Sequence, residues 1–305
     1  MFKRGIAAIF LLLFNFTLLF ATSTADFKDG GSVVFLVDDF HSSVSNEISY
    51  DIYNYLFERD LECDLINCES SISRQKWLVE NEINLNDNLK YLIMMPLSYY
   101  GFERSLEMAA SKGIHIIIVE NDINYESAIK ILVPWQKASN SLLSYVSSSD
   151  NDIKNFVELQ GNLMGGNASS ISTEFKKNVT KNNWKINRIQ ENCSSRQLGY
   201  EKTLSYYRTA VDKGQTFFFV HTMEASRGFL DASLMIDQDS LQLLSLDVND
   251  AIKKSILCGY TTAGIYYERN YGERINQLIE DNNLANSIYY LDYELISKET
   301  LDESE

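Results

Sequence analysis

The stretch 156-FVELQGNLMGGNAS-169 joins a short apolar run, a glycine-rich turn and a polar segment with helical potential. A strand that leads through a tight turn into a helix is the building unit of α/β folds with a parallel sheet. The same unit also presents backbone N–H groups to an anion at the start of the helix. The stretch therefore raises two questions: whether the unit recurs along the chain, and whether this turn holds a phosphate.

Apolar runs of strand length recur along the chain, and helical patterns lie between them. Runs that are apolar on both faces are typical of parallel strands covered by helices on both sides. The expected strands are 33–37, 63–67, 91–95, 115–119, 155–160, 186–190, 216–220 and 241–247, and the expected helices include 46–60, 103–113 and 198–214. This alternation predicts right-handed βαβ units and an α/β fold.

Eight strands could form one large sheet or two smaller sheets. The weakest patterning lies in 134-PWQKASNSLLSYVSSSDND-152, which is polar and serine-rich. A chain of 305 residues has room for two domains that each bury a core. We therefore place a crossover in this segment and expect two doubly wound parallel-sheet domains of similar size.

The first residues have the layout of a secretory signal. Lys3 and Arg4 form a basic start, an apolar run covers 6–20, and small residues follow in 21-ATSTAD-26. The alternative is a retained membrane anchor, but an apolar run of about 15 residues is short for a span of roughly 20. We expect residues 1–25 to be a signal peptide and the mature protein to be soluble and exported.

The net charge bears on the class of partner. Residues 1–25 hold two basic residues and no acidic residue, so their removal changes the net charge from −15 to −17. A strongly acidic surface repels phosphate backbones, so we expect no nucleic-acid partner.

The cysteine pattern gives neither a disulfide nor a metal site. Cys63 and Cys68 lie five positions apart in one expected strand, so their side chains point to opposite faces. Zinc sites usually use pairs two to four positions apart. We expect buried free thiols and no bound metal.

The glycine turn of the opening stretch matches only half of a phosphate-binding loop. Gly161 and Gly166 have the spacing of a P-loop, but Asn167 and Ala168 stand where the lysine and the Ser or Thr would follow. Without them the loop lacks the charge for the phosphates and the ligand for Mg²⁺. We expect the turn to face a neutral ligand, and we expect no cofactor.

Catalytic patterns are missing from the sequence. The three histidines, His41, His115 and His221, have no metal-binding spacing, and no G-x-S-x-G elbow is present. His115 lies within an apolar strand and is expected to be structural. We expect no catalytic residues and no enzyme activity.

Polar residues gather after the ends of several expected strands, where ligands bind in open α/β sheets. These residues are Asp38, Asp39 and His41, then Glu120, Asn121 and Asp122, then His221 and Thr222, and finally Asp247 and Asn249. Each group could also be ordinary loop solvation. Their recurrence at strand ends favours a shared ligand site.

Four longer stretches carry a resemblance to a known family. They are 158-ELQGNLMGGNASSISTEF-175, 216-TFFFVHTMEASRGFLDA-232, 243-LLSLDVNDAIKKSI-256 and 287-SIYYLDYELISKETLDE-303. With them the chain resembles the type I periplasmic binding proteins, and within these the ribose- and galactose-type sugar-binding proteins, as a diverged member. The similarity runs from about Ser32 to Glu303.

The resemblance implies two lobes joined by three hinge strands, with the ligand trapped between them by closure. The first lobe would be 31–131 plus 267–288, and the second 132–266 plus 289–305. Asp247 matches the family's carboxylate that binds sugar hydroxyls. Together with the strand ends, the expected ligand-binding residues are Asp39, His41, Glu120, Asn121, Trp135, Arg196, His221, Thr222, Asp247, Tyr266 and Tyr267.

Three positions depart from the family pattern. The first loop, 38-DDFHSSVS-45, offers only Phe40 where the family has stacking aromatics, and Ile171 stands where an arginine is expected. Trp135 replaces a hinge asparagine, and 133-VPW-135 is similar to a co-receptor for trimethylamine N-oxide. Trp135 could stack on a sugar, hold a methylated cation by cation–π attraction, or simply pack the seam between the lobes.

The leading hypothesis is a monomeric periplasmic protein that captures a small, sugar-like ligand and delivers it to the permease of an ABC importer. The alternative is a ligand-sensing co-receptor for a histidine kinase or chemoreceptor. A secreted hydrolase is the third hypothesis, and it requires a nucleophile–base pair for which the sequence has no motif.

Overall fold

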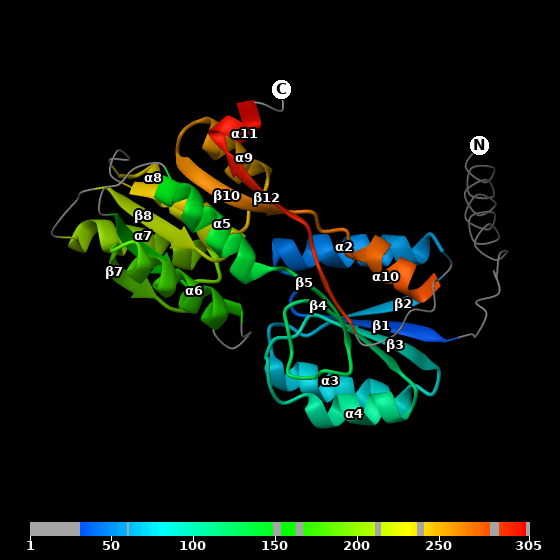
Figure 1. Ribbon diagram of the computed structural model, residues 1–305. Coiled ribbons are helices and arrows are strands. Elements are labelled where there is room, and N and C mark those ends of the chain that lie inside the picture. Colours follow the sequence, from blue (N-terminus) through cyan, green and yellow to red (C-terminus); the bar gives the residue numbers. More distant parts are fainter. Residues whose placement is uncertain are drawn as a thin grey trace, which may run out of the picture.

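The structure is a computed structural model that describes residues 31–59, 61–148, 154–162, 167–210, 215–236, 241–280 and 287–302. The expected signal peptide, 1–25, and part of the glycine turn, 163–166, lie outside the described residues. The chain forms two lobes, each built on its own six-stranded sheet (Figure 1). The prediction of two mostly parallel sheets with alternating helices is confirmed.

The first sheet has the order β11-β5-β4-β3-β1-β2, and its described strand pairs are all parallel. Its strands are β1 (Ser32–Val37), β2 (Cys63–Asn67), β3 (Leu89–Met94), β4 (His115–Glu120), β5 (Ile129–Leu132) and β11 (Ile288–Tyr290). Its helices are α2 (Ser43–Phe57), α3 (Ile72–Leu85), α4 (Glu103–Ser111) and α10 (Tyr271–Glu280). Figure 1 shows α2 and α10 on one face of this sheet and α3 and α4 on the other.

The alternation of side chains along β1 explains why both faces are covered. Val33, Phe35 and Val37 pack into the cluster that contains α2 and α10, while Val34 and Leu36 pack into the cluster that contains α3 and α4. Successive residues of a strand point to opposite faces. A strand that is apolar at every position therefore needs helices on both sides.

The second sheet has the order β12-β10-β9-β8-β6-β7, and β12 runs antiparallel to β10. Its strands are β6 (Asn155–Leu159), β7 (Lys185–Gln190), β8 (Thr216–Val220), β9 (Leu241–Ser245), β10 (Thr261–Tyr267) and β12 (Tyr293–Ser297). The helices of this lobe are α5 (Trp135–Ser148), α6 (Asn167–Lys181), α7 (Arg196–Thr209), α8 (Met223–Ser233), α9 (Asp250–Leu257) and α11 (Lys298–Asp302). Its core is aromatic: the rings of Phe175 and Phe219 stack with centroids 4.6 Å apart.

Helices α7 and α8 approach each other closely through two glycines. A Cβ atom at Gly228 would lie 2.0 Å from the backbone oxygen of Arg196, and one at Gly199 would lie 2.3 Å from that of Ala225. Backbone atoms cannot move aside as a flexible side chain would. Glycine is therefore required at this helix contact.

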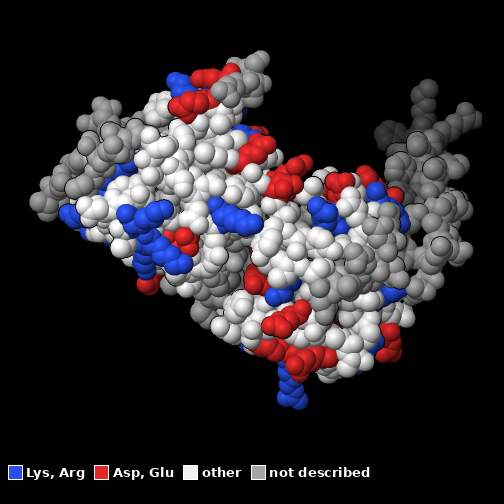
Figure 2. Space-filling view, in the orientation of Figure 1, with Lys and Arg blue, Asp and Glu red and all other residues white. Residues whose placement is uncertain are grey.

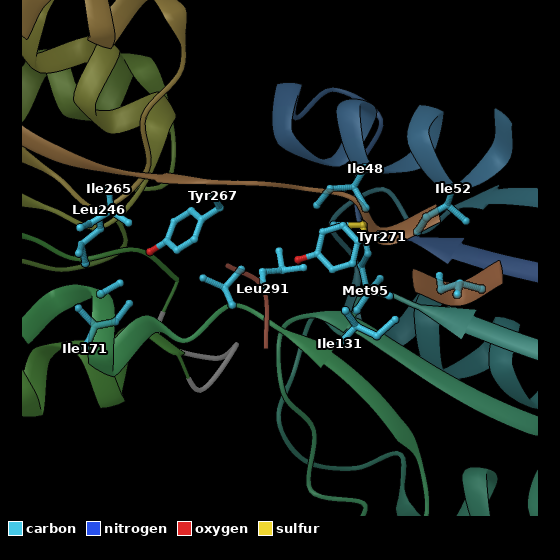
Figure 3. Close-up of a cluster of buried hydrophobic side chains, with 14 of the residues drawn as sticks. Ile48, Ile52, Met95, Ile131, Ile171, Leu246, Ile265, Tyr267, Tyr271 and Leu291 are labelled. Atoms are coloured by element: carbon cyan, nitrogen blue, oxygen red, sulfur yellow. The ribbon is translucent and has the colours of Figure 1, made fainter. Parts of the chain in front are cut away.

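The chain passes between the two sheets three times. The passages lie between β5 and α5, between β10 and α10, and between β11 and β12. Figure 3 shows Tyr267 among side chains of the second lobe, Tyr271 among those of the first, and Leu291 between the two. The exact lobe boundaries given above stay a prediction.

The structure also corrects parts of the sequence analysis. All eight expected strands are found, but β5, β10, β11 and β12 were not expected. The serine-rich segment does hold a passage between lobes, yet it forms helix α5, because Ala138, Leu142 and Val146 recur at helical spacing on a buried face. The expected helix 198–214 ends at Thr209, and 211–214 lie outside the described residues.

The cysteines are free thiols. Cys63, Cys68 and Cys193 are buried, and Cys258 is exposed at the end of α9. Burial raises the pKa of both Cys63 and Cys68 to about 12. The prediction for Cys63 and Cys68 is confirmed. In the part of the chain that the structure describes, no helix combines the length and the apolar character needed to cross a membrane.

Candidate functional site

The carboxyl ends of the two sheets line a shared cavity of about 230 Å³. From the first lobe it is lined by Asp38 after β1 and by Glu120 at the end of β4. From the second lobe it is lined by His221 after β8 and Asp247 after β9. Parallel strands bring their carboxyl ends to one edge, so residues far apart in sequence meet there.

Two carboxylates define the first lobe's side of the cavity. Asp38 is partly buried, and its Oδ1 accepts a hydrogen bond of 2.7 Å from the backbone N–H of Asp39. Glu120 is buried, and its Oε2 accepts a hydrogen bond of 2.5 Å from the hydroxyl of Tyr271 on α10. Burial raises the pKa of Asp38 and of Glu120 above their ordinary values.

Glu120 also has an unusual backbone conformation. Its φ of 67° lies in the left-handed region, which non-glycine residues seldom adopt. Such conformations cost of order 1–3 kcal/mol and persist where the surrounding structure fixes them. Here β4 and the Tyr271 hydroxyl hold Glu120 from two sides, so its carboxylate has a fixed position.

Asp247 forms a buried ion pair with Arg269, which lies on the passage from β10 to α10. The Nη2–Oδ2 distance is 2.8 Å, and both side chains are 5% exposed. Burial lowers the pKa of Arg269, but the negative charges of Asp247 and Glu120 raise it by more, so the net shift is upward. Among the described residues, Oδ1 of Asp247 and Nε of Arg269 have no hydrogen-bond partner.

A second buried pair fixes His221. Its Nε2 lies 3.0 Å from Oε1 of Glu158, which is fully buried in β6. The other oxygen of Glu158 accepts hydrogen bonds from the Ser172 hydroxyl at 3.1 Å and from the Gln160 amide at 3.2 Å. Nδ1 of His221 is buried and finds no partner within the described part of the chain. The network fixes the orientation of the imidazole before any ligand arrives.

Direct contacts between the lobes hold the cavity closed. The amide of Asn167 donates a hydrogen bond of 2.6 Å to Oδ1 of Asn121, and the hydroxyl of Ser43 donates one of 2.5 Å to Glu224. Val44 packs on the cluster that contains Met223 and is formed by the second lobe. The two lobes therefore touch each other directly beside the cavity.

Six of the eleven expected residues line the cavity: Glu120, Asn121, Trp135, His221, Thr222 and Asp247. Thr222 also caps α8 by accepting a hydrogen bond from the N–H of Ala225. Trp135 begins α5, and its ring meets Tyr267 edge-on at 5.2 Å between centroids. Trp135 thus both lines the cavity and packs the seam between the lobes.

The other five expected residues lie elsewhere. His41 is exposed and pairs with Asp39 at 2.9 Å, outside the cavity lining. Arg196 forms a bidentate pair with Asp231 on the surface. Tyr266 faces Lys253, whose Nζ is 3.7 Å from the ring centroid. Tyr267 is buried behind Trp135 and is not part of the lining.

The structure adds residues that are absent from the set of eleven expected ligand-binding residues. Asp38 and Ile171 line the cavity, while Arg269, Tyr271 and Glu158 hold the lining residues in place. A glutamate inside the apolar run 156-FVELQ-160 was a usable signal, because a carboxylate on an inner strand requires a partner. Neither Arg269 nor Tyr271 lies in a motif. Among the described residues, no group of His, Cys, Asp and Glu could hold a metal ion.

No family model matches the chain, and no curated protein matches it. Solved structures are similar. The Caulobacter myo-inositol binding protein bound to myo-inositol has a TM-score of 0.82 at 13% identity, over 92% of this chain and 98% of that one. The periplasmic binding protein component of the arabinose ABC transporter from Shewanella sp. ANA-3, bound to α- and β-L-arabinofuranose, has a TM-score of 0.80 at 16% identity, over 90% and 94%.

A third similar structure is a protein in the XylFII–LytSN complex, with a TM-score of 0.78 at 15% identity, over 88% of this chain and 98% of that one. Identities this low show the fold. The chain has the fold of the type I periplasmic binding proteins, as the sequence resemblance implied.

Proposed function

We propose that this protein is a periplasmic solute-binding protein that captures a small, sugar-like ligand between its lobes. The observation that carries the proposal is the cavity of about 230 Å³ between the lobes, lined by polar residues of which Asp247 and His221 each keep one buried atom unpartnered among the described residues. Buried polar atoms are normally satisfied, so unpartnered atoms on residues that line a cavity favour a hydrogen-bonding ligand. Similar structures hold myo-inositol and arabinofuranose.

Closure of the lobes supplies the affinity. Hydrogen bonds to charged groups contribute about 1.5–3 kcal/mol each, and they gain strength when water is excluded. The Asp247–Arg269 and His221–Glu158 pairs fix the orientation of Asp247 and His221 before the ligand binds. Little side-chain entropy is therefore lost on binding. The protein holds its ligand without chemical change and is not an enzyme in this proposal.

The test is calorimetry of the purified protein with a panel of furanoses, pyranoses and inositols. We expect at least one member to bind with a dissociation constant in the micromolar range or below. Asp247→Ala should abolish that binding, whereas Arg196→Ala, in an exposed ion pair, should leave it unchanged. Binding that survives Asp247→Ala, or no heat with any member of the panel, would contradict the proposal.

Two partners fit this function. We propose the permease of an ABC importer as the first, because the arabinose-binding structure is a component of such a transporter. A sensor at the membrane is the second candidate, since one similar structure is solved in complex with LytSN. Figure 2 shows basic side chains in small groups among acidic and uncharged ones on the visible face, which suits neither DNA nor RNA. Loss of ligand uptake on deletion would support import, and loss of a ligand-dependent transcriptional response would support sensing.

A further inference from the structure

The charges around the cavity are unbalanced. Four carboxylates, those of Asp38, Glu120, Glu224 and Asp247, line it, and its described lining contains no lysine or arginine. A neutral sugar needs hydrogen-bonding groups of both kinds and no net charge. Four carboxylates in one small cavity are therefore more than a neutral ligand explains.

Two guanidinium groups outside the lining offset part of this charge. Arg269 pairs with Asp247 at 2.8 Å, and Arg227 pairs with Glu224 at 3.2 Å. The positive charge of Arg269 acts on the Glu120 carboxylate, but Glu120 forms no ion pair with it. Instead, Glu120 accepts a hydrogen bond from the neutral hydroxyl of Tyr271. Within the described residues, no Lys or Arg forms an ion pair with Asp38 or Glu120. Two negative charges on the first lobe's side thus lack a cation of their own.

The unpartnered atoms of the second lobe also act mainly as acceptors. Oδ1 of Asp247 accepts hydrogen bonds and cannot donate while the carboxylate is ionised. His221 directs Nε2 at the carboxylate of Glu158, so in neutral His221 the Nε2 carries the hydrogen and Nδ1 is an acceptor. The indole Nε1–H of Trp135 is the one donor among these buried unpartnered atoms of the lining. The two unpartnered acceptors therefore favour a ligand that donates hydrogen bonds.

A neutral polyol donates hydrogen bonds but leaves the charges of Asp38 and Glu120 uncompensated. Removing an unpaired charge from water costs several kcal/mol, and this cost is incurred when the lobes close. An ammonium group offers three donors and the missing positive charge. The ring of Trp135 adds an aromatic wall against which a cation is favourable.

We propose that the cavity selects a protonated amino group next to hydroxyl groups, so the ligand class is amino sugars and amino polyols rather than neutral sugars of the same shape. The ammonium lies at Asp38 and Glu120 on the first lobe, and the hydroxyl groups lie at Asp247 and His221 on the second. This inference rests on the proposed function, because it places the ligand in the same cavity.

The experiment is calorimetry with matched sets in which only the amino group differs: glucose, glucosamine and N-acetylglucosamine, and the corresponding galactose set. We expect an amine to bind at least tenfold more tightly than its neutral hydroxyl counterpart, and N-acetylation to remove that gain. Equal or tighter binding of the neutral sugars would overturn the inference and leave the proposed function standing. No binding by any sugar, neutral or aminated, would count against both.

Two isosteric variants test the role of the charges. Asp38→Asn and Glu120→Gln keep the shape of each side chain and remove its charge, so each should weaken amine binding at least tenfold and change neutral-sugar binding less than threefold. Glu47→Gln, on the exposed face of α2, removes the same charge away from the cavity and is the control. If the cavity variants weaken amine and neutral sugar equally, they act through shape and the inference is wrong. Thermal unfolding monitors the fold of every variant.

Discussion

The two lobes are each built on a six-stranded, mostly parallel sheet, but they bury polar groups at their facing edges in different ways. In the second lobe, Asp247 and His221 each have a charged or ionisable partner, Arg269 and Glu158 respectively. In the first lobe, Glu120 is held by the neutral hydroxyl of Tyr271. The polar groups of the second edge thus have ionisable partners, whereas among the described residues Glu120 of the first edge forms no ion pair with a basic side chain.

The hydrophobic cores of the two lobes also differ. The second lobe packs stacked phenylalanines, with Phe156 and Phe217 at 5.5 Å and Phe175 and Phe219 at 4.6 Å between ring centroids. The first lobe also buries Phe35 and Phe102, but its inner strands pair aliphatic side chains, as in Ile93 and Ile117 of β3 and β4. Stacked aromatics add orientation-dependent energy to burial, so the second lobe should be the more rigid platform. The following predictions test this contrast.

The largest effect is expected for Arg269→Ala. It leaves Asp247 buried without its ion-pair partner, and breaking a buried pair in this way costs about 3–5 kcal/mol. Urea unfolding measures the loss. Arg196→Ala, in an exposed pair with Asp231, is the matched control and should cost less than about 1 kcal/mol. Equal losses would show that the hinge pair is no more important than a surface pair.

The next effect concerns the close contact of α7 and α8 in the second lobe. Gly228→Ala places a methyl group 2.0 Å from the backbone oxygen of Arg196, so the helices must separate, at a cost of about 3 kcal/mol. The control is Gly161→Ala, whose methyl group would lie 3.1 Å from a side-chain carbon of Thr222 and should cost about 1 kcal/mol or less. Thermal unfolding compares the two. A tolerated Gly228→Ala would mean that this helix pair is not rigid.

Asp38→Asn should stabilise the protein at neutral pH. Burial raises the pKa of Asp38 in the folded state, so ionisation of this carboxyl destabilises the folded protein. This destabilisation is absent below the pKa of Asp38 in the unfolded chain, about 3.9, and is complete above its raised pKa in the folded protein. We expect a gain of about 1 kcal/mol at pH 7.5 that disappears near pH 3.5. Denaturant unfolding at both values measures it, and a gain that persists at low pH would exclude this cause.

The smallest effect separates the two cores. A double-mutant cycle of Phe175→Leu and Phe219→Leu should give a coupling of about 0.5–1.5 kcal/mol, the usual size for an aromatic pair. The same cycle with Ile93→Val and Ile117→Val in the first lobe should give less than about 0.5 kcal/mol, because dispersion between aliphatic chains has little orientation dependence. Equal couplings would remove the distinction between an aromatic and an aliphatic lobe.

Much of the fold could be predicted from the sequence, because inner strands are apolar at every position. Strand β1 is an example, since Val33 to Val37 are all fully buried. The missed strands lack this pattern: β12, at the edge of its sheet, begins with three residues that are exposed or half-buried, and β11 has three residues. Helix α5 was not predicted, because serines occupy both exposed and buried positions and obscure the apolar periodicity.

The site was predictable only where it follows strand ends. That rule points to Glu120, His221 and Asp247, each at the end of a parallel strand or within two residues of it. It cannot choose between neighbours, and of the pair Asp38 and Asp39 the structure places Asp38 at the cavity and Asp39 beside Ser70. Arg269 could not be predicted, because its position depends on how the passage from β10 to α10 crosses between the lobes.

The exposed thiol at the end of α9 makes the protein convenient for spectroscopy. Maleimide dyes react with accessible thiolates, and Cys258 is accessible whereas the other three cysteines are buried. A single fluorophore can therefore be attached to the second lobe of the unaltered chain. One added cysteine in place of Glu47 on the first lobe would supply the second attachment point, and energy transfer between the two dyes would then report opening and closing in real time.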